Sequence, residues 1–312
     1  MADGKTRYLD VDADHAGQRL DRFLAEALPD LSRSHLKALI EDGCVTIEGR
    51  KSKPSRPVNA GEEICVDLPP DAPCEALPED IPLDILYEDD DLLIVNKPKG
   101  MTVHPAPGHE SGTLVNAVLA HCGESLSGIN GVLRPGIVHR IDKDTTGALA
   151  ICKNDAAHRA VAEQLKTHSI TRVYRGIVFG NPPEDEGTVT GNIGRSRRDR
   201  KKMAVVTEGG KEAVTHYKVL RRYAKAAYCE FTLETGRTHQ IRVHMAHIGH
   251  PLLGDTVYGP ARQPFATQGQ VLHAMVLGFS HPADGHYLEV TAPLPAYFED
   301  ILCKLEGGKT WN

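Results

Sequence analysis

Apolar and polar residues near the N-terminus follow a helical period. Residues 17–30 place their apolar side chains on one stripe, which predicts a short amphipathic helix. The stripe consists of Leu20, Phe23, Leu24, Ala27 and Leu28. Ser32 or Ser34 is placed to cap a second helix that continues through Ile40 and stops at Gly43. Val45-Thr-Ile then alternates as a strand and ends at a Glu48-Gly49 turn. The pattern predicts a small helix–helix–strand module.

Strands dominate the pattern from residue 86 onward. Leu92-Leu-Ile-Val is an apolar run typical of a buried strand, and three further segments also have strand patterns, at 148–152, 171–179 and 228–235. Two segments between them have the apolar stripe of a helix. The first follows a cap at Asn154 or Asp155 and carries Ala157, Val161 and Leu165. The second ends before Gly249 and carries Ile241, Met245 and Ile248. Strands outnumber helices and do not alternate one-to-one with them. We therefore expect an α+β domain with a mainly antiparallel sheet rather than a doubly wound fold.

The chain has 312 residues, which is enough for about two domains. Residues 69–82 hold five prolines among acidic residues, a composition typical of a stiff linker. We expect five segments. They are an N-terminal arm at 1–16, a small domain at 17–68, a linker at 69–85, a larger domain at 86–305 and a tail at 306–312.

Charge is distributed unevenly along the chain. The net charge is −6, yet residues 57–96 hold twelve acids and no Lys or Arg, so the rest of the chain is net positive. Residues 195–202 contain six cations and one acid. Such a run either contacts a phosphate backbone or forms a solvated loop.

Several classes of protein are disfavoured by composition. No apolar run approaches the length of a membrane span, and the N-terminus lacks the apolar core of a signal peptide. Seven cysteines with no Cys-x-x-Cys pair argue for reduced thiols and against a zinc ribbon or a disulfide scaffold. We expect a cytoplasmic protein that does not bind membranes.

The segment with the clearest chemistry is 136–147, which reads Gly-Ile-Val-His-Arg-Ile-Asp-Lys-Asp-Thr-Thr-Gly. If its backbone is extended, Arg140 and Asp142 share a face, while Ile141 points into the protein. An acid and an anion-binding group would then face one ligand. The same spacing also fits an aspartate that caps a turn, and we assign that role to Asp144.

Three histidines and two lysines allow further interpretations. His244, His247 and His250 have a spacing that suggests a zinc hydrolase. The third lies beyond the helix stop at Gly249 and no cysteine completes the set, which favours structural or RNA-facing histidines. Lys97 and Lys99 fit either phosphate contacts or charges at a strand edge.

The N-terminal module resembles an S4 RNA-binding domain in its order of elements and in its Ser-Arg-Ser-x-x-x-x-Leu-Ile sequence, residues 32–40. That resemblance implies RNA contacts at Arg33, Lys37 and Arg50.

The larger domain carries a set of motifs that closely resembles the RluA/RluD family of pseudouridine synthases, in particular the D-type enzymes of the ribosomal large subunit. The set comprises Asn96-Lys-Pro-Lys-Gly100, His139-Arg-Ile-Asp142, Tyr174, Gly236-Arg-Thr-His-Gln-Ile-Arg242 and Gly254-Asp255-x-x-Tyr258. The resemblance implies isomerisation of uridine to pseudouridine in RNA without metal or cofactor. A non-catalytic RNA-binding or ribosome-assembly protein on the same scaffold is the alternative.

The resemblance also implies roles for individual residues. Asp142 corresponds to the catalytic aspartate, and Arg140 to the arginine that enters the RNA stack when the uridine is extruded. Tyr174 corresponds to the tyrosine that stacks on the extruded base, and Arg242 to the basic partner of the carboxylate, with Ile241 beside it as a substrate-binding residue. Further RNA contacts are expected at Arg195, Arg197, Arg198 and Arg237. The expected partner is ribosomal RNA of the large subunit or its precursor particle, and nothing in the sequence demands a dimer.

Overall fold

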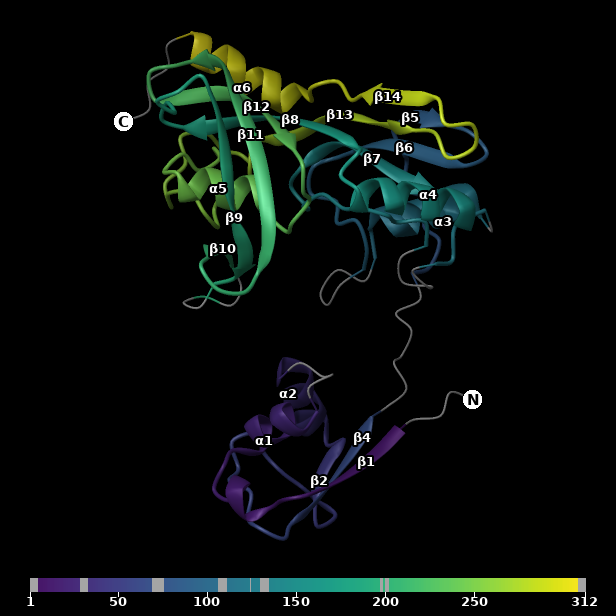
Figure 1. Cartoon of the computed structure of the whole chain (residues 1–312), viewed down its shortest axis with the longest axis vertical. Coiled ribbons are helices and arrows are strands. Elements are labelled where there is room, and N and C mark those ends of the chain that lie inside the picture. Colours follow the sequence, from purple (N-terminus) through teal and green to yellow (C-terminus); the bar gives the residue numbers. More distant parts are fainter. Residues whose placement is uncertain are drawn as a thin grey trace. The chain divides into compact units, whose positions relative to one another are not determined.

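The chain forms two compact units, Met1–Pro73 and Cys74–Asn312 (Figure 1). This structure is a computed structural model that describes residues 5–28, 33–68, 76–105, 111–123, 125–129, 135–196, 199 and 202–307.

The first unit is a four-stranded antiparallel sheet with two helices. Its strand order is β1-β4-β2-β3. The elements are β1 (Lys5–Asp10), α1 (Leu20–Ala27), α2 (Arg33–Asp42), β2 (Val45–Ile47), β3 (Arg50–Lys51) and β4 (Glu63–Leu68). The helical stripe of α1 packs with α2 and β4 in one core that includes Leu24, Leu36 and Ile64. Residues 5–10, expected as an arm, instead belong to this sheet because β1 pairs with β4 along its whole length.

The second unit is built on a ten-stranded sheet. Its order is β10-β9-β11-β12-β8-β13-β7-β6-β5, with β14 paired to β13. The strands are β5 (Ile85–Glu88), β6 (Leu92–Lys97), β7 (Thr146–Cys152), β8 (Thr171–Phe179), β9 (Glu186–Arg195), β10 (Met203–Val206), β11 (Lys211–Arg222), β12 (Ala226–Leu233), β13 (Leu272–Ser280) and β14 (Tyr287–Thr291). Among the described strands, only β7 and β13 pair in parallel. The expected α+β class with a mainly antiparallel sheet is confirmed.

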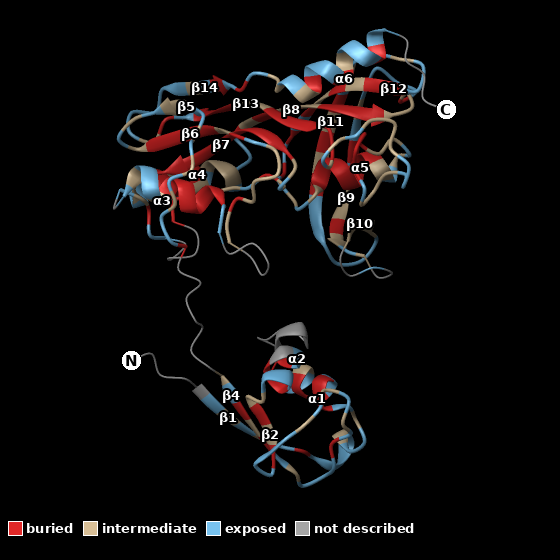
Figure 2. Cartoon of the chain, turned by 180° about the vertical axis from the view of Figure 1, so that it is seen from behind, coloured by how far each residue is buried: buried red, intermediate tan, exposed pale blue. Residues whose placement is uncertain are grey.

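Four helices cover this sheet. They are α3 (Leu114–Cys122), α4 (Asp155–Lys166), α5 (Gln240–His247) and α6 (Ala296–Glu306). Alternate residues of β6 enter different cores: Leu93 and Val95 pack in the core shared with α3 and α5, whereas Leu92 and Ile94 pack in the core shared with α4. Both faces of the central strands are therefore buried, as Figure 2 shows in red.

The start of the second unit lies within the segment expected as a linker. The Asn116 side chain of α3 donates to the backbone oxygen of Leu77 at 2.8 Å, and the Glu79 carboxylate accepts from the backbone N–H of Gly112 at 3.1 Å. Residues 77–79 are thus bound to the larger unit. Within the described residues, no helix is both long and apolar enough to cross a membrane.

Candidate active site

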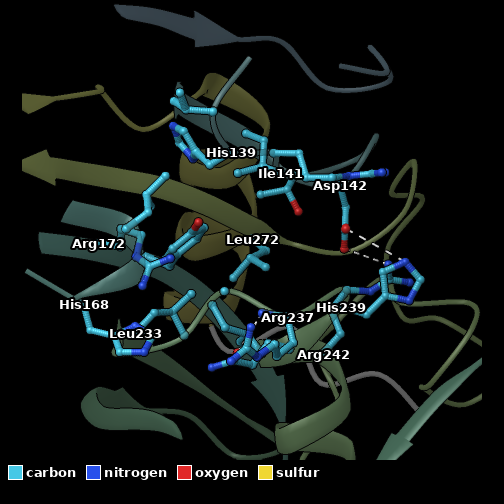
Figure 3. A pocket seen from close by; sticks show the side chains of 18 of the residues that line it. His139, Ile141, Asp142, His168, Arg172, Leu233, Arg237, His239, Arg242 and Leu272 are labelled. Carbon is cyan, nitrogen blue, oxygen red and sulfur yellow. Dashed lines mark hydrogen bonds and ion pairs between the residues drawn. The ribbon is translucent and has the colours of Figure 1, made fainter. Parts of the chain in front are cut away.

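A pocket opens at one edge of the large core, where the segment before β7, the start of β8 and the N-terminal end of α5 meet (Figure 3). Asp142, Tyr174, Ile241 and Arg242 all line it, and so do Arg140 and Arg237. Six of the side chains singled out from the sequence are therefore brought together from three separate stretches of chain.

Asp142 and Arg242 are in direct contact. Nη1 of Arg242 donates to Oδ2 of Asp142 at 2.9 Å. The guanidinium is also held by a second carboxylate, since Nε and Nη2 donate to the two oxygens of Asp255 at 2.7 and 3.0 Å. Asp255 is fully buried, whereas the Asp142 side chain stays 19% exposed. One arginine thus links a buried structural acid to an acid that a ligand can reach.

The electrostatics of the Arg242–Asp255 pair favour the charged form of both groups. Burial raises the pKa of Asp255, but hydrogen bonds and charge from Arg242 outweigh burial and leave the pKa below its ordinary value. Burial likewise opposes the charge on Arg242, yet its two carboxylate partners raise its pKa above the ordinary value. The face of the guanidinium lies 5.1 Å from the ring of Tyr258, a cation–π contact. Arg242 is therefore a fixed positive charge beside Asp142.

The segment that carries Asp142 is anchored at two points that follow this residue in the chain. Lys97, fully buried, donates through Nζ to the backbone oxygens of Pro98, Met101 and Lys143 at 2.8, 2.8 and 3.0 Å. This contact to the residue after Asp142 fits neither a phosphate contact nor an edge charge. Further along the chain, Gly147 has φ +110, and a Cβ there would lie 2.1 Å from the backbone oxygen of Ala274. A glycine is needed for β13 to approach β7 so closely.

His139 supports the same segment from inside. Its Nε2 accepts the backbone N–H of Ala150 in β7 at 3.0 Å. Burial, together with the charge of Arg172, lowers the pKa of His139 to about 4. The ring is therefore neutral at neutral pH and acts as a hydrogen-bond acceptor. The segment 138–142 has no regular secondary structure, yet Ile141 is buried and Arg140 exposed, as an extended backbone would place them.

Tyr174 supplies the aromatic surface of the pocket. It lies on β8 and is 9% exposed, and burial raises its pKa to about 12. The phenol is thus protonated, and the residue lines the pocket. Ile241, Leu233 and Leu272 add apolar lining, which suits a flat heterocycle better than a charged group.

A histidine faces the second oxygen of Asp142. His239 precedes α5 in a left-handed conformation with φ 57, and its Nε2 lies 3.9 Å from Oδ1 of Asp142. The hydroxyl of Tyr258 accepts the Met203 N–H at 3.0 Å and lies 2.8 Å from Nδ1 of His239. When that hydroxyl donates to Nδ1, the neutral ring carries its proton on Nε2, the nitrogen that lies 3.9 Å from Oδ1 of Asp142. Burial lowers the pKa of His239 against the charge of Asp142.

Of the predicted RNA-contacting residues, Arg140 lies at the pocket, whereas Lys37, Arg50 and Arg195 do not line it. Arg140 is exposed and donates to Nε2 of His104 at 3.4 Å. Lys37 pairs with Glu41 on the surface of α2 at 3.5 Å, while Arg50 and Arg195 are exposed. The side chain of Arg33, and all of Arg197 and Arg198, lie outside the described residues.

Asp144 and the histidine triplet do not contribute to the pocket. Asp144 is absent from the pocket lining, and its charge acts on Lys97 and Lys99 instead. Among the described residues, ligand atoms converge only in two groups that share the buried His281, and neither includes the triplet. His244 shares a hydrogen bond with Thr215 and His250 with the backbone of Phe179, which suits the structural interpretation.

Four residues of the site were not assigned roles from the sequence: Asp255, Tyr258, His239 and Arg172. A signal for Asp255 was present, because an aspartate directly after Leu252-Leu253-Gly254 is an acid in a buried apolar context and needs a cationic partner. No pattern in the sequence indicated which cation that was.

Comparison with known proteins agrees with this geometry. A family model described as RNA pseudouridylate synthase matches residues 91–247, and the S4 domain model matches residues 18–64. The chain belongs to the RNA pseudouridine synthase family: it is an RNA-modifying enzyme with an S4 domain at its N-terminus.

Relatives share nearly the whole chain. It is 49% identical to the uncharacterised RNA pseudouridine synthase YlyB of Bacillus subtilis, over 91% of this chain and 93% of the relative. It is 48% identical to the ribosomal large subunit pseudouridine synthase D of Zymomonas mobilis, over 89% and 91%. The solved structure of human RNA pseudouridylate synthase domain containing 1 superposes with a TM-score of 0.57 at 28% identity, covering 70% of this chain and 85% of that chain.

Proposed function

We propose that this enzyme converts specific uridines of large-subunit ribosomal RNA to pseudouridine and that Asp142 is its catalytic carboxylate. The relatives named ribosomal large subunit pseudouridine synthase D support the substrate. The observation that supports this role is the position of Asp142. Its carboxylate binds the buried guanidinium of Arg242 in a pocket that Tyr174 also lines. With ribosomal RNA as its substrate, the enzyme would act in the cytoplasm.

The chemistry begins with access to the base. A stacked uridine must leave the RNA helix before its glycosidic bond can be reached, which costs a few kcal/mol. In this proposal Arg140, exposed at the pocket, fills the gap in the stack, and Tyr174 stacks on the extruded uracil, which recovers about 1–3 kcal/mol. Arg140 and Tyr174, the two side chains that these steps need, both line the pocket.

The isomerisation itself breaks N1–C1′ and forms C5–C1′. C5 loses its hydrogen and N1 gains one, so the net reaction needs no cofactor. Asp142 acts either as the nucleophile at C1′ or as the base at C2′, and both routes need its ionised form. Arg242 places a positive charge beside the carboxylate and fixes its direction through a hydrogen bond.

Mapping of pseudouridines tests the proposal. Large-subunit ribosomal RNA from cells that lack the gene should contain uridine at one or more positions that are pseudouridine in the parent. The gene should restore these positions, and the gene with Asp142→Asn should not. An unchanged pseudouridine map without the gene would contradict the substrate, and restoration by the Asp142→Asn gene would contradict the catalytic role.

A further inference from the structure

Arg172 is a buried cation that the reaction scheme does not use. It lies on β8 two residues before Tyr174, so both side chains face the pocket. Its side chain is among the buried charges, with 7% of the residue exposed. Nη2 donates to the backbone oxygen of Glu234 at 2.7 Å, whereas Nε is buried with no partner. Within the described part of the chain, no carboxylate pairs with Arg172.

This isolation contrasts with the other buried guanidinium of the site. Arg242 has two carboxylate partners, whereas Arg172 has one backbone oxygen and a positive neighbour. Burial lowers the pKa of Arg172, the neighbouring Tyr174 raises it in part, and the charge of Arg237 lowers it further, so the pKa stays below its ordinary value. A buried charge without a counter-charge destabilises a protein, so an unpaired arginine at a pocket wall suggests that a ligand brings the counter-charge.

The wall around Arg172 is positive. Among the described residues that line the pocket, five are Lys or Arg and one is an acid, Asp142, which already binds Arg242. The five are Arg140, Lys166, Arg172, Arg237 and Arg242. Figure 3 shows Arg172 and His168 at the side of the pocket away from Asp142. The anion that fits there is therefore separate from the atoms on which Asp142 acts.

The backbone beside Arg172 is shaped to admit its guanidinium. Gly236 carries no side chain, and a Cβ at this position would lie 2.7 Å from Nη1 of Arg172. Its φ lies outside the left-handed region, so space rather than backbone conformation accounts for the glycine. The guanidinium thus lies between the Gly236 backbone and the Glu234 carbonyl oxygen, and its Nε has no hydrogen-bond acceptor among the described residues.

We propose that Arg172, together with Arg237, forms an anion-binding subsite that takes a backbone phosphate of the RNA next to the extruded uridine. The inference rests on the proposed function, because an extruded nucleotide carries its flanking phosphates to the pocket. A phosphate supplies the missing counter-charge and accepts two parallel N–H groups from a guanidinium fork. The subsite positions the nucleotide and takes no part in bond breaking.

Two variants on one strand separate this role from a structural one. Arg172→Met should leave the urea unfolding midpoint unchanged or raise it, and should raise KM for RNA about 10- to 100-fold with little change in kcat. The matched control is Arg175→Met, on the same strand, whose guanidinium pairs with Glu230. That variant should lower the midpoint and leave KM unchanged. Gly236→Ala, which displaces the Arg172 guanidinium without removing its charge, should raise KM as well.

Chemical neutralisation of the phosphate gives the decisive test. The substrate is an RNA fragment that the wild-type enzyme converts, prepared with a neutral methylphosphonate on the 5′ or the 3′ side of the target uridine. One of these two methylphosphonate substrates should raise KM for the wild-type enzyme. The same substrate should not raise KM further for Arg172→Met, because the methylphosphonate and the substitution remove the same contact.

Other outcomes would overturn the subsite. Additive effects of the variant and the methylphosphonates would mean that Arg172 contacts neither phosphate. If Arg172→Met lowers kcat and leaves KM unchanged, Arg172 contacts the uracil ring instead of a phosphate. If Arg172→Met lowers the urea unfolding midpoint and leaves KM unchanged, the role of Arg172 is structural and comes from its hydrogen bond to Glu234. If the wild type converts no large-subunit fragment, the proposed substrate fails instead, and the two failures are distinguishable.

Discussion

Arg242 and Asp255 are joined by two hydrogen bonds that use both oxygens of the carboxylate, so a single N–H of the guanidinium, on Nη1, reaches Asp142. The direction of the Asp142 carboxylate therefore depends on a fully buried acid. Under the proposed function, Arg242 both stabilises the fold through Asp255 and orients Asp142 for the reaction.

Removal of Arg242 should lower both stability and activity. Arg242→Ala leaves Asp255 buried without its cation, which costs about 3–5 kcal/mol of unfolding free energy. Urea unfolding measures that loss, and single-turnover assays measure the activity. Arg242→Lys keeps the charge but cannot reproduce the fork toward Asp255, so its values should lie between those of the wild type and Arg242→Ala. Wild-type turnover in Arg242→Ala would mean that Asp142 does not need its cationic partner.

We expect His239 to increase the reaction rate by donating a hydrogen bond from Nε2. His239→Gln keeps a donor near that position, whereas His239→Asn keeps an acceptor for Tyr258 and tolerates the left-handed backbone. We expect His239→Asn to lower the single-turnover rate about tenfold or more, and His239→Gln to lower it less. The unfolding midpoint of each variant controls for backbone strain. The reverse order of rates at equal stability would mean that the bond to Tyr258 matters and the donor does not.

His139 should make stability depend on pH. Its folded pKa of about 4 lies below the ordinary value of 6.5, so the unfolded chain binds more protons between these values. Stability is then complete above pH 6.5 and falls as the pH drops toward 4, by about 1.4 kcal/mol per pH unit at most. His139→Gln retains an acceptor for the Ala150 N–H and does not titrate, so its curve should be flatter. Urea unfolding from pH 4 to 7.5 compares the two, and parallel curves would contradict the assignment.

The basic run at 195–202 should contribute to the salt dependence of RNA binding. Replacing Arg195, Arg197 and Arg198 by Gln should make the slope of log K against log salt shallower by about 0.7–0.9 for each phosphate that the variant no longer neutralises. Arg221→Gln, on the surface and paired with Glu306, is the matched control. An unaltered slope in the triple variant would mean that the run is a solvated loop.

Much of the fold followed from periodicity, because several elements bury one face. The stripe of Ala157 and Val161 on α4 and the alternation along β8 are of this kind. β13 escaped prediction because its residues do not alternate and because His273 and Gly278 interrupt its apolar run. Its parallel pairing with β7 joins residues far apart in the chain, which no local pattern encodes.

The site was predictable to the extent that its chemistry lay in short motifs. Asp142, Tyr174 and Arg242 were found by resemblance, and the structure brings them to one pocket. Lys97 was misjudged because a lysine is usually a surface charge, whereas three backbone oxygens bind this one inside the protein. Arg172 gave no signal, since only the fold reveals that no acid among the described residues pairs with it.

The measurement that tests the central claim most directly is hydrogen release from C5 by Asp142→Asn. An RNA fragment that the wild type converts is labelled with tritium at C5 of uridine, and its affinity and tritium release are measured for both proteins. We expect Asp142→Asn to bind with an affinity close to that of the wild type and to release no tritium to water. Release by Asp142→Asn at a rate near that of the wild type would contradict a catalytic role for this carboxylate.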